Sequence, residues 1–399
     1  MNTTLPDGAI LRTADAGDLD QLYTLLADRG LPEDAIDLQL VVEGDGAGID
    51  GTAVVEQDGK AVATATLLDE TIVVGDTPLP IGQVELVAAH TDYEHRGYVR
   101  ALMGWCHERS AQRGQVAQVM IGIPYFYRRF GYVYAIPMHP YALLQALPEV
   151  DPAVEVRPAT DSDIPEMAGL QERLQQSFDL YMPHGDETWR WLLEREGTEQ
   201  LVATRRHEFI GCARTTPFTG NEPMLVAEIA ASEPAAVAAL LATAMGPDGA
   251  RETTVELRPG VPGLAALLGP PLRADWYYVR IPDVPNLFAA LRPELERRLQ
   301  RSEFATSDRV VEISFWESQL AFPIANGHVG PITTGGPRQI IVADGGSGIP
   351  PDAVAHLTFG CGAGLEDRFP DCYLGDQTAL MHALFPPRRA DLLTFYLAS

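Results

Sequence analysis

Residues 86–103 read LVAAHTDYEHRGYVRALM. The apolar start is typical of a strand, the polar middle of a turn, and the rest of a helix that begins at the Arg96-Gly97 step. Such a helix start directs unpaired backbone N–H groups and the positive end of the helix dipole at one place, which favours an anion. Gly97 permits close approach to the backbone, and Arg96 and His95 could add charge. The alternative is an ordinary strand-to-helix turn.

The chain on both sides of this segment predicts an α/β unit. Upstream, residues 51–89 alternate apolar and polar positions, with turn signals at Asp58-Gly59 and Gly75-Asp76, so we expect an antiparallel meander that ends in a strand at 82–89. Downstream we expect a helix over 96–113, a strand over 115–123, a short helix over 124–130 and a last strand over 131–136. The apolar stripe of the long helix comprises Val99, Leu102, Met103 and Cys106.

An internal repeat suggests that this unit occurs twice. Residues 12–19 read RTADAGDL and residues 157–164 read RPATDSDI, and both fit R-x-A-x-x-x-D-[LI]. Each follows an apolar strand-like segment and leads into an apolar-periodic helix that an Asp can cap. The order of strand, helix, strand and short helix also recurs between residues 154 and 278, which indicates a duplicated α/β domain.

The second copy has lost the features that would hold an anion. Residues 231–240 read ASEPAAVAAL where the first copy has TDYEHRGYVR, so the Arg-Gly step is missing. Residues 262–270 read PGLAALLGP where the first copy has PYFYRRFGY, so the tyrosines and arginines are missing. We therefore expect one active site per chain, in the first copy. The sequence changes character again near Tyr278, and strand-like segments at 309–315 and 339–343 indicate a third domain of mixed α and β.

The composition restricts the partners. The 399 residues carry a net charge of −26, which would repel nucleic acid and anionic membranes, so we expect neither as a partner. The charge reflects solubility in the simplest interpretation, although an acidic surface would also attract cationic amines. The four cysteines show no metal-site or redox spacing, so we expect reduced thiols and no bound metal. Without a signal-like N-terminus or a long apolar run, the sequence predicts a cytoplasmic protein.

The segment at 86–103 resembles motif A of the GNAT superfamily of acetyltransferases, commonly V-x-x-H-P-x-Y-R-G-R-G-x-G-R-x-L-M. The matching positions are Val87, His90, Tyr93, Arg96, Gly97, Arg100, Leu102 and Met103, and the departures are Thr91, Glu94, His95 and Val99. Glu94 would place a carboxylate near the expected pyrophosphate unless its side chain points away. Residues 123–132, IPYFYRRFGY, resemble motif B of the same superfamily, and Tyr127 falls on its tyrosine.

The whole chain resembles the Eis-type (enhanced intracellular survival) acetyltransferases. The resemblance rests on the two tandem units, the WRWLL segment at 189–193 and the VRIPDVPNL segment at 279–287. It implies an α/β (α+β) fold with an active N-terminal GNAT domain over 1–150 and a degenerate central GNAT domain over 151–278. A C-terminal domain like sterol carrier protein would occupy 279–399, and the chain would form a homo-oligomer, a hexamer by family resemblance.

The resemblance also implies a mechanism with acetyl-CoA as cosubstrate. The coenzyme would lie along the strand at Leu86, Val87 and Ala88 and over the loop formed by His95, Arg96, Gly97, Tyr98 and Val99. Tyr127 would protonate the leaving thiolate, as a positioned acid can. The carboxylate of the C-terminal residue, Ser399, would act as the base.

The acceptor implied by the resemblance is a small-molecule amine resembling an aminoglycoside, a polyamine or lysine. For the other aromatic residues of 125–134, packing in the core is the simpler interpretation. The alternative function for the chain is a non-catalytic protein that binds or senses acyl-CoA or another small ligand.

Overall fold

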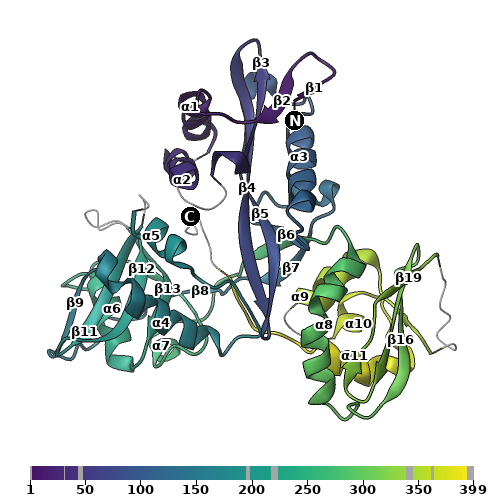
Figure 1. Cartoon of the computed structure of the whole chain (residues 1–399). Coiled ribbons are helices and arrows are strands. Elements are labelled where there is room, and N and C mark those ends of the chain that lie inside the picture. The colour runs from purple at the N-terminus through teal and green to yellow at the C-terminus, as the bar shows by residue number, and fades with distance from the viewer. Residues whose placement is uncertain are drawn as a thin grey trace.

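A computed structural model describes residues 2–30, 32–43, 48–194, 198–216, 223–337, 345–360 and 364–392. The chain forms three lobes, each built on its own sheet: the first at the top of Figure 1, the second at the lower left and the third at the lower right. The fold is mixed α/β, as the sequence predicts. Within the described ranges, no helix has the length and apolar character needed to span a membrane.

The first lobe is a strongly twisted sheet with helices on both faces. Two helices, α1 (Leu19–Arg29) and α2 (Pro32–Glu43), lie on one side and α3 (Tyr98–Gln112) on the other (Figure 1). Leu102, Met103 and Cys106 of α3 are buried against the strands, and Val99 is partly buried beside them. Neighbouring strands in the sheet follow the order β1 (Thr3–Thr4), β2 (Ile10–Thr13), β3 (Thr52–Gln57), β4 (Lys60–Val74), β5 (Thr77–Ala89), β6 (Ala117–Met120), β15 (Trp276–Arg280) and β7 (Val133–Pro137). The 3-10 helix η1 (Ile49–Gly51) comes directly before β3.

The predicted meander is present, with turns at Asp58-Gly59 and Gly75 in positive-φ conformations. Its last strand then separates from its neighbour. Strands β5 and β6 pair in parallel from Ile81↔Ala117 to Gln83↔Val119, and β5 continues beyond that pairing to Ala89. A bulge accompanies the separation, because Leu86 has φ +53 and the register with β4 shifts opposite it. One edge of the chain at 86–88 is thereby left open for a ligand.

The second lobe repeats this plan. Its strands follow the order β8 (Tyr141–Leu143), β14 (Thr253–Glu256), β13 (Met224–Ala231), β12 (Glu208–Thr215), β11 (Glu199–Arg205) and β9 (Val154–Pro158). Its helices are η4 (Asp161–Asp163), α4 (Ile164–Gln175), α5 (Asp186–Glu194), α6 (Pro234–Met245) and α7 (Leu264–Leu267). Strands β13 and β14 are parallel, and β13 also carries a positive-φ residue, Glu228 (φ +46).

The repeated octapeptides form the same local structure in both lobes. Arg12 donates two hydrogen bonds to the Asp18 carboxylate, at 2.6 and 2.8 Å. Arg157 donates two to Asp163, at 2.8 and 2.7 Å. In both copies the carboxylate also accepts the backbone N–H three residues before it. Such a bidentate pair fixes the turn into the helix, which gives a physical reason for the repeated Arg and Asp.

The two lobes exchange strands at their junction. Strand β15 follows the second lobe in the chain, yet it lies between β6 and β7 of the first sheet. Strand β8 precedes the second lobe and pairs with β14 in the second sheet. The residues of β8 fall inside the domain that the sequence predicts over 1–150, although this strand belongs to the second sheet. The domain boundary predicted at 278 falls within β15. Because a strand pairs with whichever edge it reaches, chain order alone does not reveal such an exchange.

The third lobe contains the strands β16 (Asp308–Ser314), β17 (Gln319–Ala325), β18 (His328–Val329), β19 (Thr333–Gly335) and β20 (Ser347–Gly348). Its helices are α8 (Val284–Gln300), η6 (Pro351–Ala353), α9 (Val354–Phe359), α10 (Leu365–Arg368), η7 (Gly375–Gln377) and α11 (Thr378–Leu384). The strand predicted at 309–315 corresponds to β16, whereas the one predicted at 339–343 lies outside the described residues.

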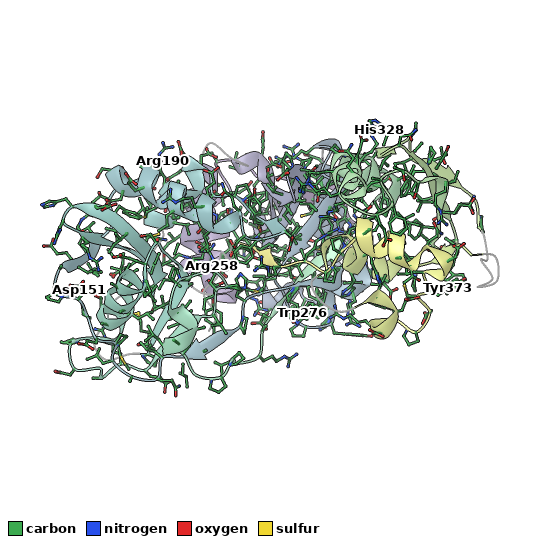
Figure 2. All side chains as sticks on the ribbon, turned by 90° about the horizontal axis from the view of Figure 1, so that it is seen from below. Asp151, Arg190, Arg258, Trp276, His328 and Tyr373 are labelled. Carbon is green, nitrogen blue, oxygen red and sulfur yellow. The ribbon has the colours of Figure 1, made fainter. Side chains whose placement is uncertain are left out.

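Two short strands tie the lobes together. Strand β10 (Leu180–Tyr181) pairs with β4 of the first lobe, and β21 (Ala390–Asp391), near the end of the chain, pairs with β10. The Asp391 carboxylate is buried and accepts hydrogen bonds from Arg258, at 2.8 and 2.6 Å, and from Gln175 at 2.9 Å. In Figure 2 Arg258 lies toward the middle of the molecule. Strand β21 is thus held against the second lobe.

Candidate active site

The loop between β5 and α3 forms a backbone cradle. The 3-10 helix η2 (Thr91–Tyr93) follows β5, and its cap His90 accepts a hydrogen bond from the Asp92 N–H at 3.2 Å. His95 (φ +63) and Gly97 (φ +87) then take left-handed conformations on either side of Arg96. Alternating conformations of this kind turn successive N–H groups toward one side, and the first turn of α3 carries no acidic residue. The predicted anion site therefore has the required backbone shape.

The glycine pattern of motif A has a direct explanation in this loop. His95 stands where the pattern has its first glycine, and it adopts the left-handed conformation that glycine accepts without strain. A side chain in that conformation costs about 1–2 kcal/mol. The chain therefore keeps the loop geometry at some cost in stability and gains an imidazole at the rim of the cradle.

The Glu94 carboxylate is engaged by an arginine from α1. Its Oε1 accepts a hydrogen bond from Arg29 Nη2 at 2.7 Å, and Arg29 Nε donates to the Ala89 carbonyl at 2.8 Å. Arg29 thus joins the end of β5 to the loop and balances the charge of Glu94. The conflict that the sequence raises between this carboxylate and a bound pyrophosphate is reduced by the ion pair.

A pocket of about 590 Å³ opens beside the cradle. Its size lies within the range that holds a small molecule or cofactor. Six of the eight expected cofactor-binding residues line it: Val87, Ala88, His95, Gly97, Tyr98 and Val99. Besides tyrosines, the ionisable side chains in its lining are Arg29, Arg100, Arg129, His95 and Glu94. On a protein with a net charge of −26, this pocket is a basic site suited to a polyanion.

The side chains of three of the expected cofactor residues are engaged elsewhere: Tyr98, Arg96 and Leu86. The Tyr98 side chain is buried, and its hydroxyl donates to Asp7 at 2.7 Å and to Gln57 at 3.0 Å, so only its backbone can meet a ligand in the cradle. The Arg96 guanidinium lies 4.8 Å from the centre of the Tyr93 ring and is not among the side chains that line the pocket. The Leu86 side chain is buried toward α1 and α2.

Tyr127 lies where this pocket meets a smaller one. It belongs to the 3-10 helix η3 (Phe126–Phe130) and is 5% exposed. Its ring packs so closely on Gly122 that a Cβ there would come within 2.4 Å of the ring. Burial raises the pKa of the Tyr127 phenol well above its ordinary value, and the charge of Glu85 adds to the shift. The phenol therefore keeps its proton at neutral pH.

The smaller pocket, of about 200 Å³, lies between the open edge of β5 and the first two helices. Arg29, Val87, Ala88, Ile123 and Tyr127 line both pockets. The residues that line only the smaller one include two carboxylates, Asp34 and Glu85, and the latter is 6% exposed. The smaller, acidic pocket thus adjoins the larger, basic pocket, and Tyr127 lies at the boundary between them.

Comparison with known proteins identifies the first lobe. The family model of the acetyltransferase (GNAT) domain matches residues 12–135. The chain is an enzyme that carries a GNAT-family N-acetyltransferase domain. The matched segment contains the whole cradle, both pockets' β5 residues and Tyr127. A sequence search of curated proteins gives no match.

Solved structures share the fold of the whole chain. A GCN5-related N-acetyltransferase from Anabaena variabilis aligns with a TM-score of 0.70 at 14% identity, over 97% of this chain and 100% of that one. A GCN5-related N-acetyltransferase from Kribbella flavida gives 0.69 at 17%, with the same coverages. Eis1 from Mycobacterium abscessus gives 0.61 at 18%, over 94% of this chain and 97% of that one. At these identities the likeness concerns the fold.

The second lobe lacks such a cradle at the corresponding helix. Helix α6 is capped by Glu233, whose carboxylate pairs with Arg205 at 2.8 Å. Residues 231–233, which lead into α6, include no residue with positive φ, so the alternating conformations seen at His95–Gly97 are missing there. The short helix α7 also packs close by, because a Cβ on Gly263 would come within 3.0 Å of Pro234.

Sequence reasoning left out three residues of the GNAT site. Arg29 gave no local signal, because its partner Glu94 is 65 residues away. Gly122 stands next to the IPYFY segment, and a small residue beside a tyrosine could have indicated a ring packed on the backbone. Tyr278 marked the expected domain boundary, yet its hydroxyl contacts the chain just before Tyr127. The expected base, Ser399, lies outside the described residues.

Proposed function

We propose that the GNAT domain transfers the acetyl group of acetyl-CoA to a primary amine of a small cationic molecule, such as an aminoglycoside, a polyamine or a lysine side chain. One observation carries the proposal: the buried, protonated Tyr127 borders both a basic pocket and an acidic pocket. The basic pocket suits the phosphates of the coenzyme, and the acidic pocket suits a positively charged amine.

The open edge of β5 provides the place for the thioester. The coenzyme pyrophosphate would bind the backbone N–H groups at Arg96–Val99, and its pantetheine amides would pair with Leu86–Ala88, past the point where β6 diverges. The backbone N–H near Val87 would then polarise the acetyl carbonyl as an oxyanion-hole donor. His95, Arg100 and Arg129 would balance the phosphate charge from the rim of the pocket.

The proton transfers follow from these positions. The neutral amine attacks the acetyl carbonyl carbon, the C–S bond breaks, and the thiolate takes the phenol proton of Tyr127. A base must remove the proton of the attacking amine, and we propose the Ser399 carboxylate. The seven residues that follow Leu392 can span at most about 24 Å. Glu85, which lines the acidic pocket, is the alternative base.

The rest of the chain fits an Eis-type architecture, which we propose on the whole-length fold likeness to Eis1 from Mycobacterium abscessus. In this proposal the second lobe is a GNAT fold without its own coenzyme site, because the residues that lead into α6 lack the left-handed conformations of the first-lobe loop. The third lobe would be the domain like sterol carrier protein. A hexamer in the cytoplasm is the assembly and location that this architecture implies.

The release of free thiol from acetyl-CoA tests the function directly. The purified chain would be supplied with acetyl-CoA and, in turn, with polyamines, aminoglycosides and lysine peptides. We expect amine-dependent thiol release with at least one class. Binding of acetyl-CoA without release above hydrolysis for any amine would instead support a non-catalytic acyl-CoA sensor.

Tyr127→Phe should lower kcat by about 10²–10³-fold, because it removes only the proton donor, and should leave the Kd for acetyl-CoA within about 3-fold. Tyr23→Phe is a matched control, because Tyr23 is a partly buried tyrosine of α1 that lines neither pocket. Equal turnover of Tyr127→Phe and the wild type would remove Tyr127 from the role of acid.

A further inference from the structure

The backbone immediately before Tyr127 is held by a side chain from outside the GNAT match. Tyr125 has φ +67, an unfavourable conformation for a residue with a side chain, and it caps the 3-10 helix that carries Tyr127. Its N–H donates a hydrogen bond of 2.7 Å to the Tyr278 hydroxyl. The same hydroxyl donates to the Ile123 carbonyl at 3.4 Å. One phenol thus bridges both ends of the turn at 123–125.

Tyr278 itself is rigidly placed. It is fully buried, and β15 pairs it with Met120 on one side and with Tyr134 on the other. Its ring stacks on Tyr134 at 3.9 Å between ring centres and meets the edge of the Tyr127 ring at 6.0 Å. A phenol locked on both sides can hold the strained turn in one position, since strain persists only where the surroundings fix it.

We propose that Tyr278 is a positioning residue for acetyl transfer. Its hydroxyl holds the left-handed turn at Tyr125 and thereby sets the place of the Tyr127 phenol at the boundary of the two pockets. Because β15 comes after the second lobe in the chain, the catalytic tyrosine is aligned only when the second lobe has delivered that strand. This proposal rests on the proposed acetyl transfer.

Three variants test it in the full-length chain. Tyr278→Phe removes the hydroxyl and keeps the ring. Tyr277→Phe is the matched control, because Tyr277 is the neighbouring buried tyrosine of the same strand and lines neither pocket. Tyr125→Gly introduces the residue that accepts positive φ without strain, alone and combined with Tyr278→Phe.

We expect Tyr278→Phe to lower kcat at least 10-fold, with KM for acetyl-CoA changed less than 3-fold, and Tyr277→Phe to keep kcat within 2-fold of the wild type. In the background of Tyr125→Gly, the loss caused by Tyr278→Phe should shrink to less than 3-fold, because glycine no longer needs the tether. A purely structural role would lower kcat equally in both backgrounds, and that result would overturn the proposal, as would an unchanged kcat in Tyr278→Phe.

Amide hydrogen exchange separates a failure of this inference from a failure of the proposed function. Exchange at residues 123–131 should be at least 10-fold faster in Tyr278→Phe than in Tyr277→Phe, whether or not the wild type releases thiol. If the wild type is inactive with every amine, the proposed function fails. The exchange result alone then shows whether the Tyr278 hydroxyl holds the turn at Tyr125. Equal exchange in the two variants would overturn this inference.

Discussion

At the scale of single residues, the site combines a strained loop with a compensating arginine. His95 holds a left-handed conformation so that the loop can expose its N–H groups, and Arg29 neutralises the carboxylate of the preceding residue, Glu94. The sequence identified the loop from its Arg-Gly step but could not assign a direction to the Glu94 side chain. That direction depends on a partner from a helix far upstream.

The Arg29–Glu94 pair leads to a prediction for coenzyme affinity. Arg29→Ala should raise the KM for acetyl-CoA about 5- to 20-fold, because it removes a cation from the pocket and leaves the Glu94 charge unbalanced near the phosphates. The double variant Arg29→Ala, Glu94→Gln should recover at least half of the coenzyme binding free energy that Arg29→Ala loses. Steady-state kinetics at fixed amine would measure both. No recovery in the double variant would mean that Glu94 does not act on the coenzyme.

The identity of the base is a second prediction at this scale. If the Ser399 carboxylate is the base, two glycines appended after Ser399 should lower kcat about 10-fold or more at neutral pH, because they displace the carboxylate. Glu85→Gln should then change kcat less than 3-fold. A pH-rate profile would contradict this assignment if the extended chain were fully active and Glu85→Gln were impaired. Glu85 would then be the base.

At the scale of elements, single strands determine how the lobes join. Strand β15, which follows the second lobe in the chain, pairs within the first sheet, and β21 pairs with β10. The sequence predicted α3, η3 and the end of β5, because apolar period and turn residues are local signals, but it placed the start of β5 at residue 82 rather than at Thr77. It did not predict the partners of β8, β15 or β21, because strand pairing depends on which edges meet.

The buried Arg258–Asp391 pair should hold β21 in place. Arg258→Ala leaves a buried carboxylate without its arginine, which typically costs about 3–5 kcal/mol, whereas Arg258→Met with Asp391→Asn should cost much less. Calorimetry should show the first thermal transition lowered more by the single variant than by the double one. Arg205→Ala breaks partly exposed pairs and should cost below about 1 kcal/mol. Equal losses for Arg258→Ala and the double variant would contradict the role of the pair.

At the scale of the whole molecule, the three lobes meet in one buried apolar cluster, the junction, which includes Ile72 of β4, Trp189 of α5 and Phe288 of α8. Glu70 lies two residues before Ile72 on β4 and is partly buried, and burial raises its pKa to about 7, although the charge of His184 in the second lobe opposes the shift. The elements packed at this junction carry further charges, including the His184–Glu228 pair at 2.7 Å. The charge state of the junction therefore changes near neutral pH.

Glu70 gives a prediction for the pH dependence of stability. The unfolded chain releases the Glu70 proton near its ordinary pKa of about 4.5, whereas the folded chain holds it until about pH 7. Between these values the folded state binds more protons, so the contribution of Glu70 to stability falls as the pH rises. Allowing for partial exposure, the loss is on the order of 1–2 kcal/mol above pH 7.

Glu70→Gln should consequently raise the melting temperature at pH 7.5 and leave it nearly unchanged at pH 4.5. Glu43→Gln, at the end of α2, provides the control and should show no such dependence. Thermal unfolding across this range would measure both. A melting temperature for Glu70→Gln that follows the wild type at every pH would show that the Glu70 proton is not linked to folding.

The sequence by itself determined the local structure of the site and of the turns that lead into the helices. The cradle at 86–103, the short helix that carries Tyr127 and the paired Arg-Asp turns all follow from residues that lie within a few positions of one another. Short-range backbone geometry, helix dipoles and bidentate ion pairs act over just that range, so their signatures survive in the one-dimensional chain.

Only the tertiary structure decided what surrounds this local structure. The Arg29–Glu94 pair joins residues 65 positions apart, and the Tyr278 hydroxyl reaches Tyr125 across 153 positions. Both contacts exist because particular elements pack or pair at the first sheet: α1 beside the end of β5, and β15 between β6 and β7. Backbone hydrogen bonding requires that the buried edge of a sheet be paired, but it does not determine which strand of the chain pairs there. Such contacts therefore appear only in the tertiary structure.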